Sequence, residues 1–151
     1  MLAMPGGEST TISRLIHREE IAPEIVAHVE AGKPLLATCA GLIVAAREVP
    51  DERVNNLGLL DIAVQRNAFG RQKDSFETTL SVEGIQGRVP AVFIRAPLVT
   101  AVGDEVEVLA RHNQEIVAVR QGSVLGTAFH PELTAATAIH EIAFGSLLAN
   151  V

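Results

Sequence analysis

The chain has 151 residues, of which 48% are hydrophobic and 20% are charged, and its formal net charge is −6. This composition is typical of one globular domain over residues 1–151 and excludes a disordered chain. The acidic balance without a basic run argues against a nucleic-acid partner. Since no apolar stretch approaches bilayer length and no basic-then-apolar leader opens the chain, we expect no membrane association.

A single cysteine, Cys39, excludes an internal disulfide framework and is typical of a reducing cytosol, so we expect a cytoplasmic protein. The aromatic residues are five Phe, with no Tyr and no Trp. The core must therefore be built from Val, Ile, Leu and Ala. Such a core is typical of a parallel sheet covered by helices.

The predicted elements alternate between strand and helix in the first third of the chain, and strands follow one another later. In chain order they are an apolar run at 2–4, helices over 10–20 and 23–31, a strand over 35–38, a helix over 42–47, a strand over 61–66, strand-like stretches near 76–82, 90–95, 106–110, 115–120 and 123–129, and a helix over 135–148. This order predicts a mixed α/β sheet with antiparallel additions.

Local signals refine several of these elements. Ser9 or Thr10 is the expected cap of the first helix, whose buried stripe would be Ile12, Leu15 and Ile16. The sequence at 120–123 favours a hairpin. Residues 51–58 and the polar stretch 67–74 read as loops.

Cys39 lies between an apolar, strand-like segment and the small residues Ala40 and Gly41, which open a helical pattern. A strand, a sharp turn and a helix would hold the sulfur at a helix N-terminus, where unpaired N–H groups favour the reactive thiolate. A free cysteine is more often a packing residue than a nucleophile, so this reading depends on a partner elsewhere.

His130 and Glu132 supply that partner. They are two residues apart in an extended segment, so both side chains can point the same way. An imidazole oriented by a carboxylate can activate a thiol. The alternatives are a core histidine and, for Glu132, a helix-start carboxylate near Thr134.

The paired glycines Gly6 and Gly7 form either a tight turn or part of a site. In the second reading, the N–H groups of Gly7 and Ala40 make a two-donor oxyanion hole. Arg66 and Arg95 each end an apolar strand, where a guanidinium can pair with a substrate carboxylate rather than with solvent. The other histidines lack metal-ligand spacing, and we expect no metal site: His17, His28, His112 and His140.

Six stretches together resemble the glutaminase subunit of pyridoxal 5′-phosphate synthase, within the triad-type (class I) glutamine amidotransferases. They are PGGESTT at 5–11, ATCAG at 37–41, RNAFGRQ at 66–72, FIRAP at 93–97, VRQG at 119–122 and FHPEL at 129–133. The resemblance spans essentially the whole chain. It implies a flavodoxin-like three-layer sandwich with a mixed, mostly parallel sheet and antiparallel additions.

The resemblance also implies a reaction. Cys39 would attack the side-chain amide of L-glutamine and release ammonia, with His130 as general base and then acid, and Glu132 orienting it. Glutamine would be held by the residues matching the family's binding positions, which are Gly7, Glu8, Ser9, Arg66, Ile94 and Arg95. Ammonia would pass to the separate synthase (lyase) subunit, and this subunit would hold no cofactor itself.

Members of this family begin about forty residues earlier, with a strand, a helix and a second strand, so the resemblance implies that this opening is missing here. Either the true start lies upstream of Met1 or the chain is a fragment. Because that N-terminal layer would be absent, one alternative is a non-catalytic partner that binds the synthase without turnover. A separate alternative is a related Cys-His-Glu hydrolase acting on another γ-glutamyl amide.

Overall fold

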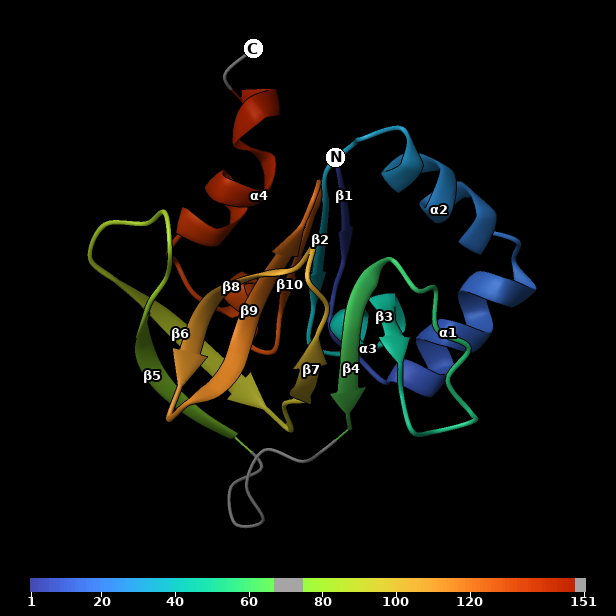
Figure 1. The fold of residues 1–151 in the computed structure, drawn as a ribbon, viewed down its shortest axis with the longest axis horizontal. Coiled ribbons are helices and arrows are strands. Elements are labelled where there is room, and N and C mark those ends of the chain that lie inside the picture. Colours follow the sequence, from blue (N-terminus) through green and yellow to red (C-terminus); the bar gives the residue numbers. More distant parts are fainter. Residues whose placement is uncertain (67–74, 149–151) are drawn as a thin grey trace.

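The computed structural model describes residues 1–66 and 75–148, and its elements follow the predicted order from strand–helix alternation to successive strands (Figure 1). They are β1 (Leu2–Met4), α1 (Ser9–Arg18), α2 (Ala22–Glu30), β2 (Leu35–Thr38), α3 (Ala40–Ala45), β3 (Ala46–Glu48), β4 (Leu60–Gln65), β5 (Ser75–Ser81), β6 (Arg88–Ile94), β7 (Leu98–Val102), β8 (Glu107–His112), β9 (Glu115–Gln121), β10 (Val124–Thr127), the 3-10 helix η1 (Pro131–Leu133) and α4 (Ala138–Leu148). The predicted loop at 67–74 lies outside the described residues.

Within the described ranges, the strands form one eight-stranded sheet and one two-stranded sheet. The large sheet has the order β1-β2-β10-β9-β7-β4-β3, with β8 paired to β9, and the small sheet is the antiparallel pair β5-β6. Pairing is parallel between β1, β2 and β10 and between β3 and β4, and antiparallel elsewhere. The predicted α/β fold with a mixed sheet is confirmed, although parallel pairs form a smaller share of the sheet than expected.

Helices cover both faces of the parallel strands. Helix α3 contacts β2, β10 and β4 and carries α1 on its outer side, whereas α4 contacts β2. Figure 1 shows α4 on the opposite side of β1, β2 and β10 from α1 and α2. This arrangement leaves the carboxyl ends of β1 and β2, where chemistry-bearing residues follow each strand, at one edge of the sheet. None of the described helices is long and apolar enough to cross a bilayer.

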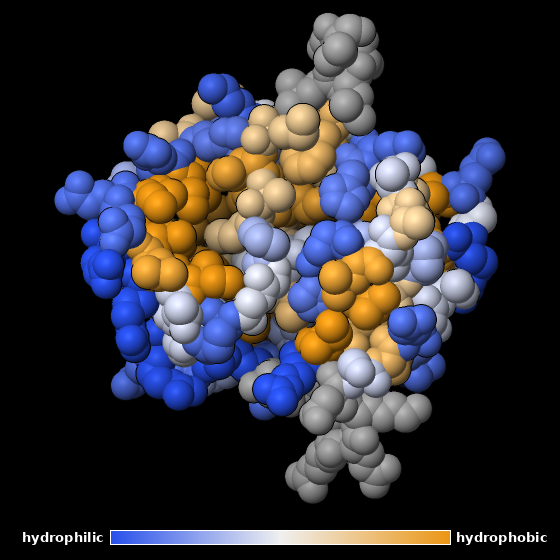
Figure 2. Space-filling model, turned by 180° about the vertical axis from the view of Figure 1, so that it is seen from behind, coloured by the Kyte–Doolittle hydropathy of each residue, from blue (hydrophilic) through white to orange (hydrophobic). Residues whose placement is uncertain are grey.

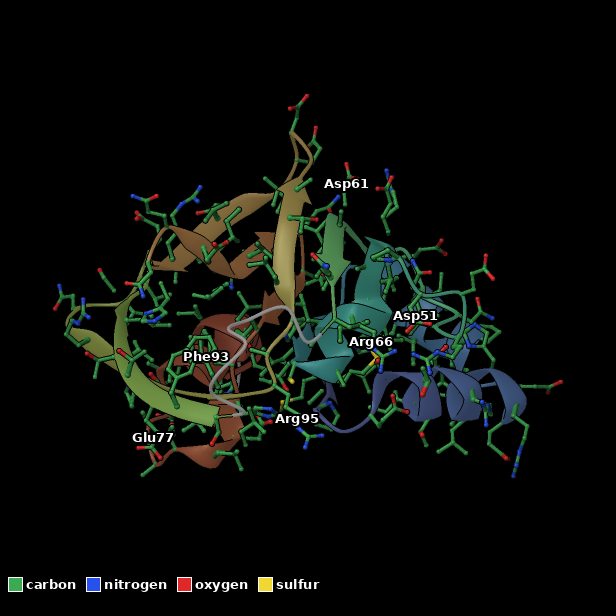
Figure 3. All side chains as sticks on the ribbon, turned by 90° about the horizontal axis from the view of Figure 1, so that it is seen from below. Asp51, Asp61, Arg66, Glu77, Phe93 and Arg95 are labelled. Carbon is green, nitrogen blue, oxygen red and sulfur yellow. The ribbon has the colours of Figure 1, made fainter. Side chains whose placement is uncertain are left out.

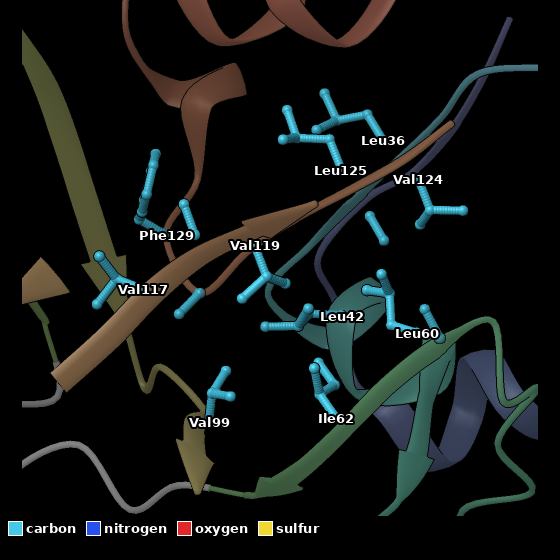
Figure 4. Packing of buried hydrophobic residues seen from close by; sticks show 14 of the residues in the cluster. Leu36, Leu42, Leu60, Ile62, Val99, Val117, Val119, Val124, Leu125 and Phe129 are labelled. Atoms are coloured by element: carbon cyan, nitrogen blue, oxygen red, sulfur yellow. The ribbon is translucent and has the colours of Figure 1, made fainter. Parts of the chain in front are cut away.

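The core is aliphatic, as the composition predicts. Side chains of β2, α3, β4, β9 and β10 interdigitate between the helices and the sheet (Figure 4), among them Leu36, Leu42, Leu60, Ile62, Val119 and Leu125. Gly126 faces this cluster, because a Cβ there would stand 2.5 Å from Leu42 Cδ1. Two of the five Phe extend the core toward the small sheet, with Phe76 stacked on Phe93 at a centroid distance of 4.6 Å.

Two details of the predicted first helix were wrong. Helix α1 is capped by Glu8 rather than by Ser9 or Thr10, since the Glu8 carboxylate accepts the N–H groups of Thr10 and Thr11. Leu15 is 44% exposed, whereas Ile12 and Ile16 of the predicted stripe pack partly buried against the core, and the fully buried residues of that helix are Ser9 and Ser13. Figure 2 shows apolar side chains reaching the surface on the face opposite to the view of Figure 1.

Two strands were missed. The helix after Cys39 ends at Ala45, and Ala46–Glu48 form β3 where a longer helix was expected. Strand β7, at Leu98–Val102, follows directly on Pro97 and was not expected. The predicted hairpin at 120–123 is confirmed, with Gly122 at a φ of 57° between β9 and β10.

Candidate active site

Cys39 occupies the strained corner between β2 and α3. Its backbone has a φ of 50° and a ψ of −107°, in a region that a residue with a Cβ rarely adopts. The Cys39 N–H donates to Thr127 O at 2.8 Å, which ties the corner to the end of β10. The close approach of β1 requires Gly41, because a Cβ there would stand 1.9 Å from Met4 O.

A cavity of about 630 Å³ opens at this corner. It is lined by Gly7, Glu8, Ser9, Cys39, Ala40, Ile43, Arg66, Ser75, Ile94, Arg95 and His130. Segments that are far apart in the sequence therefore meet at one site: the turn after β1, the corner after β2, and the ends of β4, β6 and β10. Of the predicted site residues, only Glu132 does not line the cavity itself.

Glu132 lies behind His130. The His130 Nδ1 atom is 2.7 Å from Glu132 Oε1, so the carboxylate fixes the ring orientation and leaves Nε2 for another partner. The Thr38 hydroxyl is 3.4 Å from the same oxygen. His130 is further held by its backbone N–H, which donates to Val92 O at 2.8 Å, and its exposure is 9%.

Burial raises the pKa of the Cys39 thiol to about 11. The N–H of Ala40 acts in the opposite direction, and the Glu132 charge adds to the increase. The expectation that the helix N-terminus yields a thiolate was therefore wrong, because desolvation of the sulfur outweighs one backbone donor. The thiol instead donates to Ile94 O, with the sulfur 3.7 Å from that oxygen.

The two predicted oxyanion donors, Gly7 and Ala40, lie in the turn after β1 and at the start of α3. Gly7 has a φ of 148°, a conformation that glycine adopts without strain, and Ala40 is the first residue of α3. Both residues line the cavity with Cys39. Their roles as donors stay a prediction.

Ser9 stands out because its hydroxyl is buried without a hydrogen-bond partner among the described residues. The residue is 3% exposed and lines the cavity. A buried hydroxyl without a partner is costly, so this atom is suited to meet a polar ligand group.

Charged side chains surround the mouth of the cavity. The Arg66 guanidinium pairs with Glu8 at 3.0 Å and also with Asp51. The hydroxyl and N–H groups of Thr10 and Thr11 lower the pKa of Glu8 to about 2. Arg95 has a φ of 45° and forms no ion pair within 1–66 or 75–148. Figure 3 shows Arg66 and Arg95 from below, where both lie near the ends of their strands.

Two neighbours of the predicted residues were missed from sequence. Thr38 belongs to the stretch at 37–41 but had no expected role, and Asp51 lies in a loop between two strands and carries no motif of its own. Of the family-like stretch at 66–72, only Arg66 lies within the described residues. No group of three or more His, Cys, Asp or Glu suited to a metal occurs in the described part of the chain.

Comparison with known proteins gives one matching family profile and relatives that share one name. Residues 1–144 match the profile of the SNO glutamine amidotransferase family. The chain is 62% identical over 144 residues to pyridoxal 5′-phosphate synthase subunit PdxT of Haloarcula marismortui, covering 95% of this chain and 73% of that protein. It is 51% identical to the PdxT subunit of Shouchella clausii, covering 99% of this chain and 76% of the relative.

A solved structure described as a glutamine amidotransferase superposes with a TM-score of 0.90 at 47% identity, covering 99% of this chain and 78% of its own. The PurLQS structure from Thermotoga maritima superposes with a TM-score of 0.61 at 21% identity and shares the fold.

Proposed function

The chain belongs to the SNO glutamine amidotransferase family, and we propose that it hydrolyses L-glutamine to L-glutamate and ammonia, which it supplies to the synthase subunit that forms pyridoxal 5′-phosphate. The observation that carries this proposal is the shared cavity of Cys39 and His130, with Glu132 behind the imidazole. A cytoplasmic location stays a prediction.

The catalytic cycle begins with a neutral thiol. Because burial raises the pKa of Cys39, the proton leaves only when His130 accepts it at Nε2, as the sulfur attacks the side-chain carbonyl carbon of glutamine. The carbonyl oxygen becomes an oxyanion, and the N–H groups of Gly7 and Ala40 stabilise it. Each such donor contributes about 3–4 kcal/mol of transition-state stabilisation.

Collapse of this intermediate breaks the C–N bond. The protonated His130 gives its proton to the leaving nitrogen, which departs as ammonia and leaves a glutamyl thioester on Cys39. Water then attacks the thioester while His130 accepts a proton from it. The sulfur leaves with that proton, so glutamate and the free thiol are restored. The carboxylate of Glu132 stabilises the imidazolium at both stages.

The rim of the cavity matches the zwitterionic end of glutamine. Its α-carboxylate suits Arg66 and Arg95, and its α-ammonium suits the Glu8 carboxylate, all of which line the same cavity. The Ser9 hydroxyl, which has no partner among the described residues, supplies a further polar contact. These binding roles, with those of Gly7 and Ile94, are part of the proposal.

The experiment measures ammonia release from glutamine, with and without the synthase subunit, for the wild type and for Cys39→Ala. We expect release by the wild type in the complex and none by the variant, which circular dichroism should show to be folded. Binding to the synthase without turnover by the wild type would instead favour a non-catalytic partner. A preference for γ-glutamyl peptides over glutamine would favour the related hydrolase.

A further inference from the structure

Arg66 is held between two carboxylates from different parts of the chain. One guanidinium nitrogen donates to Asp51 and the other donates to Glu8 at 3.0 Å. The Arg66 side chain is 17% exposed and that of Asp51 is 16% exposed, so both partners are largely removed from solvent. Figure 3 shows Asp51 and Arg66 next to one another at the end of β4. A guanidinium has five N–H donors, so donors remain for a ligand.

Asp51 is itself fixed by its own loop. Its carboxylate accepts the backbone N–H of Arg53 at 3.0 Å and two bonds from the Arg53 guanidinium at 3.0 and 2.8 Å. Its backbone N–H donates to Val49 O at 2.8 Å, and its carbonyl accepts the N–H of Val54 at 3.0 Å. The acceptor that meets Arg66 therefore has a defined position before any substrate arrives.

A second cavity also borders Arg66. Its volume is about 380 Å³, and it is lined by Pro50, Asp51, Arg53, Gln65 and Arg66. Arg66 thus lines both this cavity and the active-site cavity. Without the bond to Asp51, the long Arg66 side chain would have open space in which to adopt other rotamers, and substrate binding would have to restrict it again.

Asp51 has two opposite effects on the affinity for glutamine. Its charge weakens the attraction between Arg66 and a substrate carboxylate, whereas its geometry pre-orders the guanidinium. The Arg53 guanidinium offsets much of that charge, because it pairs with the same carboxylate. Pre-ordering is therefore the larger effect.

We propose that Asp51 is a positioning residue for glutamine binding, which holds the Arg66 guanidinium at the mouth of the active-site cavity for the α-carboxylate of the substrate. The inference rests on the proposed function. Asp51 touches no reacting atom, so its loss weakens binding of the substrate without changing the chemical step.

The test uses Asp51→Asn, which keeps the shape and the acceptor for the Arg53 N–H but loses the charge. In the complex with the synthase subunit, we expect the KM for glutamine to rise about tenfold with kcat within about twofold of wild type. Asp51→Glu, which keeps a carboxylate at this position, should have a KM for glutamine much closer to that of the wild type than Asp51→Asn has. Glu52→Gln, which removes the exposed neighbouring carboxylate, is the matched control and should leave both constants unchanged.

Calorimetric binding of L-glutamine to complexes carrying Cys39→Ala, with and without Asp51→Asn, separates this inference from the proposed function. Weaker binding by the double variant supports it. Equal binding, or a fall in kcat at unchanged KM, overturns the proposed role of Asp51 and leaves the proposed function standing. No glutamine binding by either protein would remove both the proposed function and this inference.

Discussion

The imidazole of His130 lies against the backbone of Gly6, so that a Cβ built on residue 6 would stand 2.3 Å from His130 Cε1 and 3.0 Å from Nδ1. A contact of that length cannot exist, so any side chain at residue 6 must displace the ring. The turn after β1 therefore sets where the imidazole can sit, in addition to carrying the neighbouring Gly7.

Gly6→Ala should consequently impair catalysis more than folding. We expect kcat for glutamine hydrolysis in the complex to fall by on the order of a hundredfold, because a displacement of about 1 Å in a catalytic group has that effect. The matched control is Gly145→Ala in α4, where an added Cβ would meet no described atom within 4 Å beyond the backbone of its own helix. A Gly6→Ala variant with wild-type kcat would show that the His130 position does not matter.

Ser9→Ala should affect binding without loss of stability. The Ser9 hydroxyl has no partner among the described residues, so its removal breaks no internal hydrogen bond and relieves a buried polar group. We expect the midpoint of urea unfolding to stay the same or to rise, and the KM for glutamine to increase about fivefold, as for one lost neutral hydrogen bond of about 1 kcal/mol. An unchanged KM would exclude a contact between this hydroxyl and the substrate.

The pH dependence of Cys39 alkylation tests the state of the thiol. Because its pKa is raised to about 11, the thiolate fraction and the rate with iodoacetamide should increase about tenfold per pH unit up to roughly pH 10 in the folded chain. The same chain in urea is the control, and its rate should level off near the ordinary thiol pKa of about 8.5. A plateau below about pH 8 in the folded protein would indicate a thiolate already formed in the resting site.

Motifs with a local cause could be predicted from the sequence. The strand–turn–helix around Cys39 and the Gly122 hairpin follow from short apolar runs bounded by small residues, and both were found. The common cavity of Cys39, His130 and Arg66 was expected from their positions at strand ends and from the family resemblance.

Features that depend on tertiary packing could not be predicted in this way. The pKa of Cys39 is set by burial under segments distant in sequence, and a helix N-terminus in isolation indicates the opposite direction. The spacing places Leu15 in a buried stripe with Ile12 and Ile16, yet Leu15 is exposed in the structure, whereas Ile12 and Ile16 pack partly buried against the core and Ser9 and Ser13 are buried. The ion pair between Asp51 and Arg66 joins two loop positions that share no sequence pattern.

The central claim is that the Cys39 sulfur attacks glutamine and that His130 takes its proton. The most direct measurement incubates the complex with a diazoketone analogue of glutamine, which alkylates an activated nucleophile, and maps the adduct by peptide mass spectrometry. We predict one adduct on Cys39, prevented by excess glutamine and strongly slowed in His130→Asn. An adduct on another residue, or labelling of Cys39 at an equal rate in His130→Asn, would contradict the account.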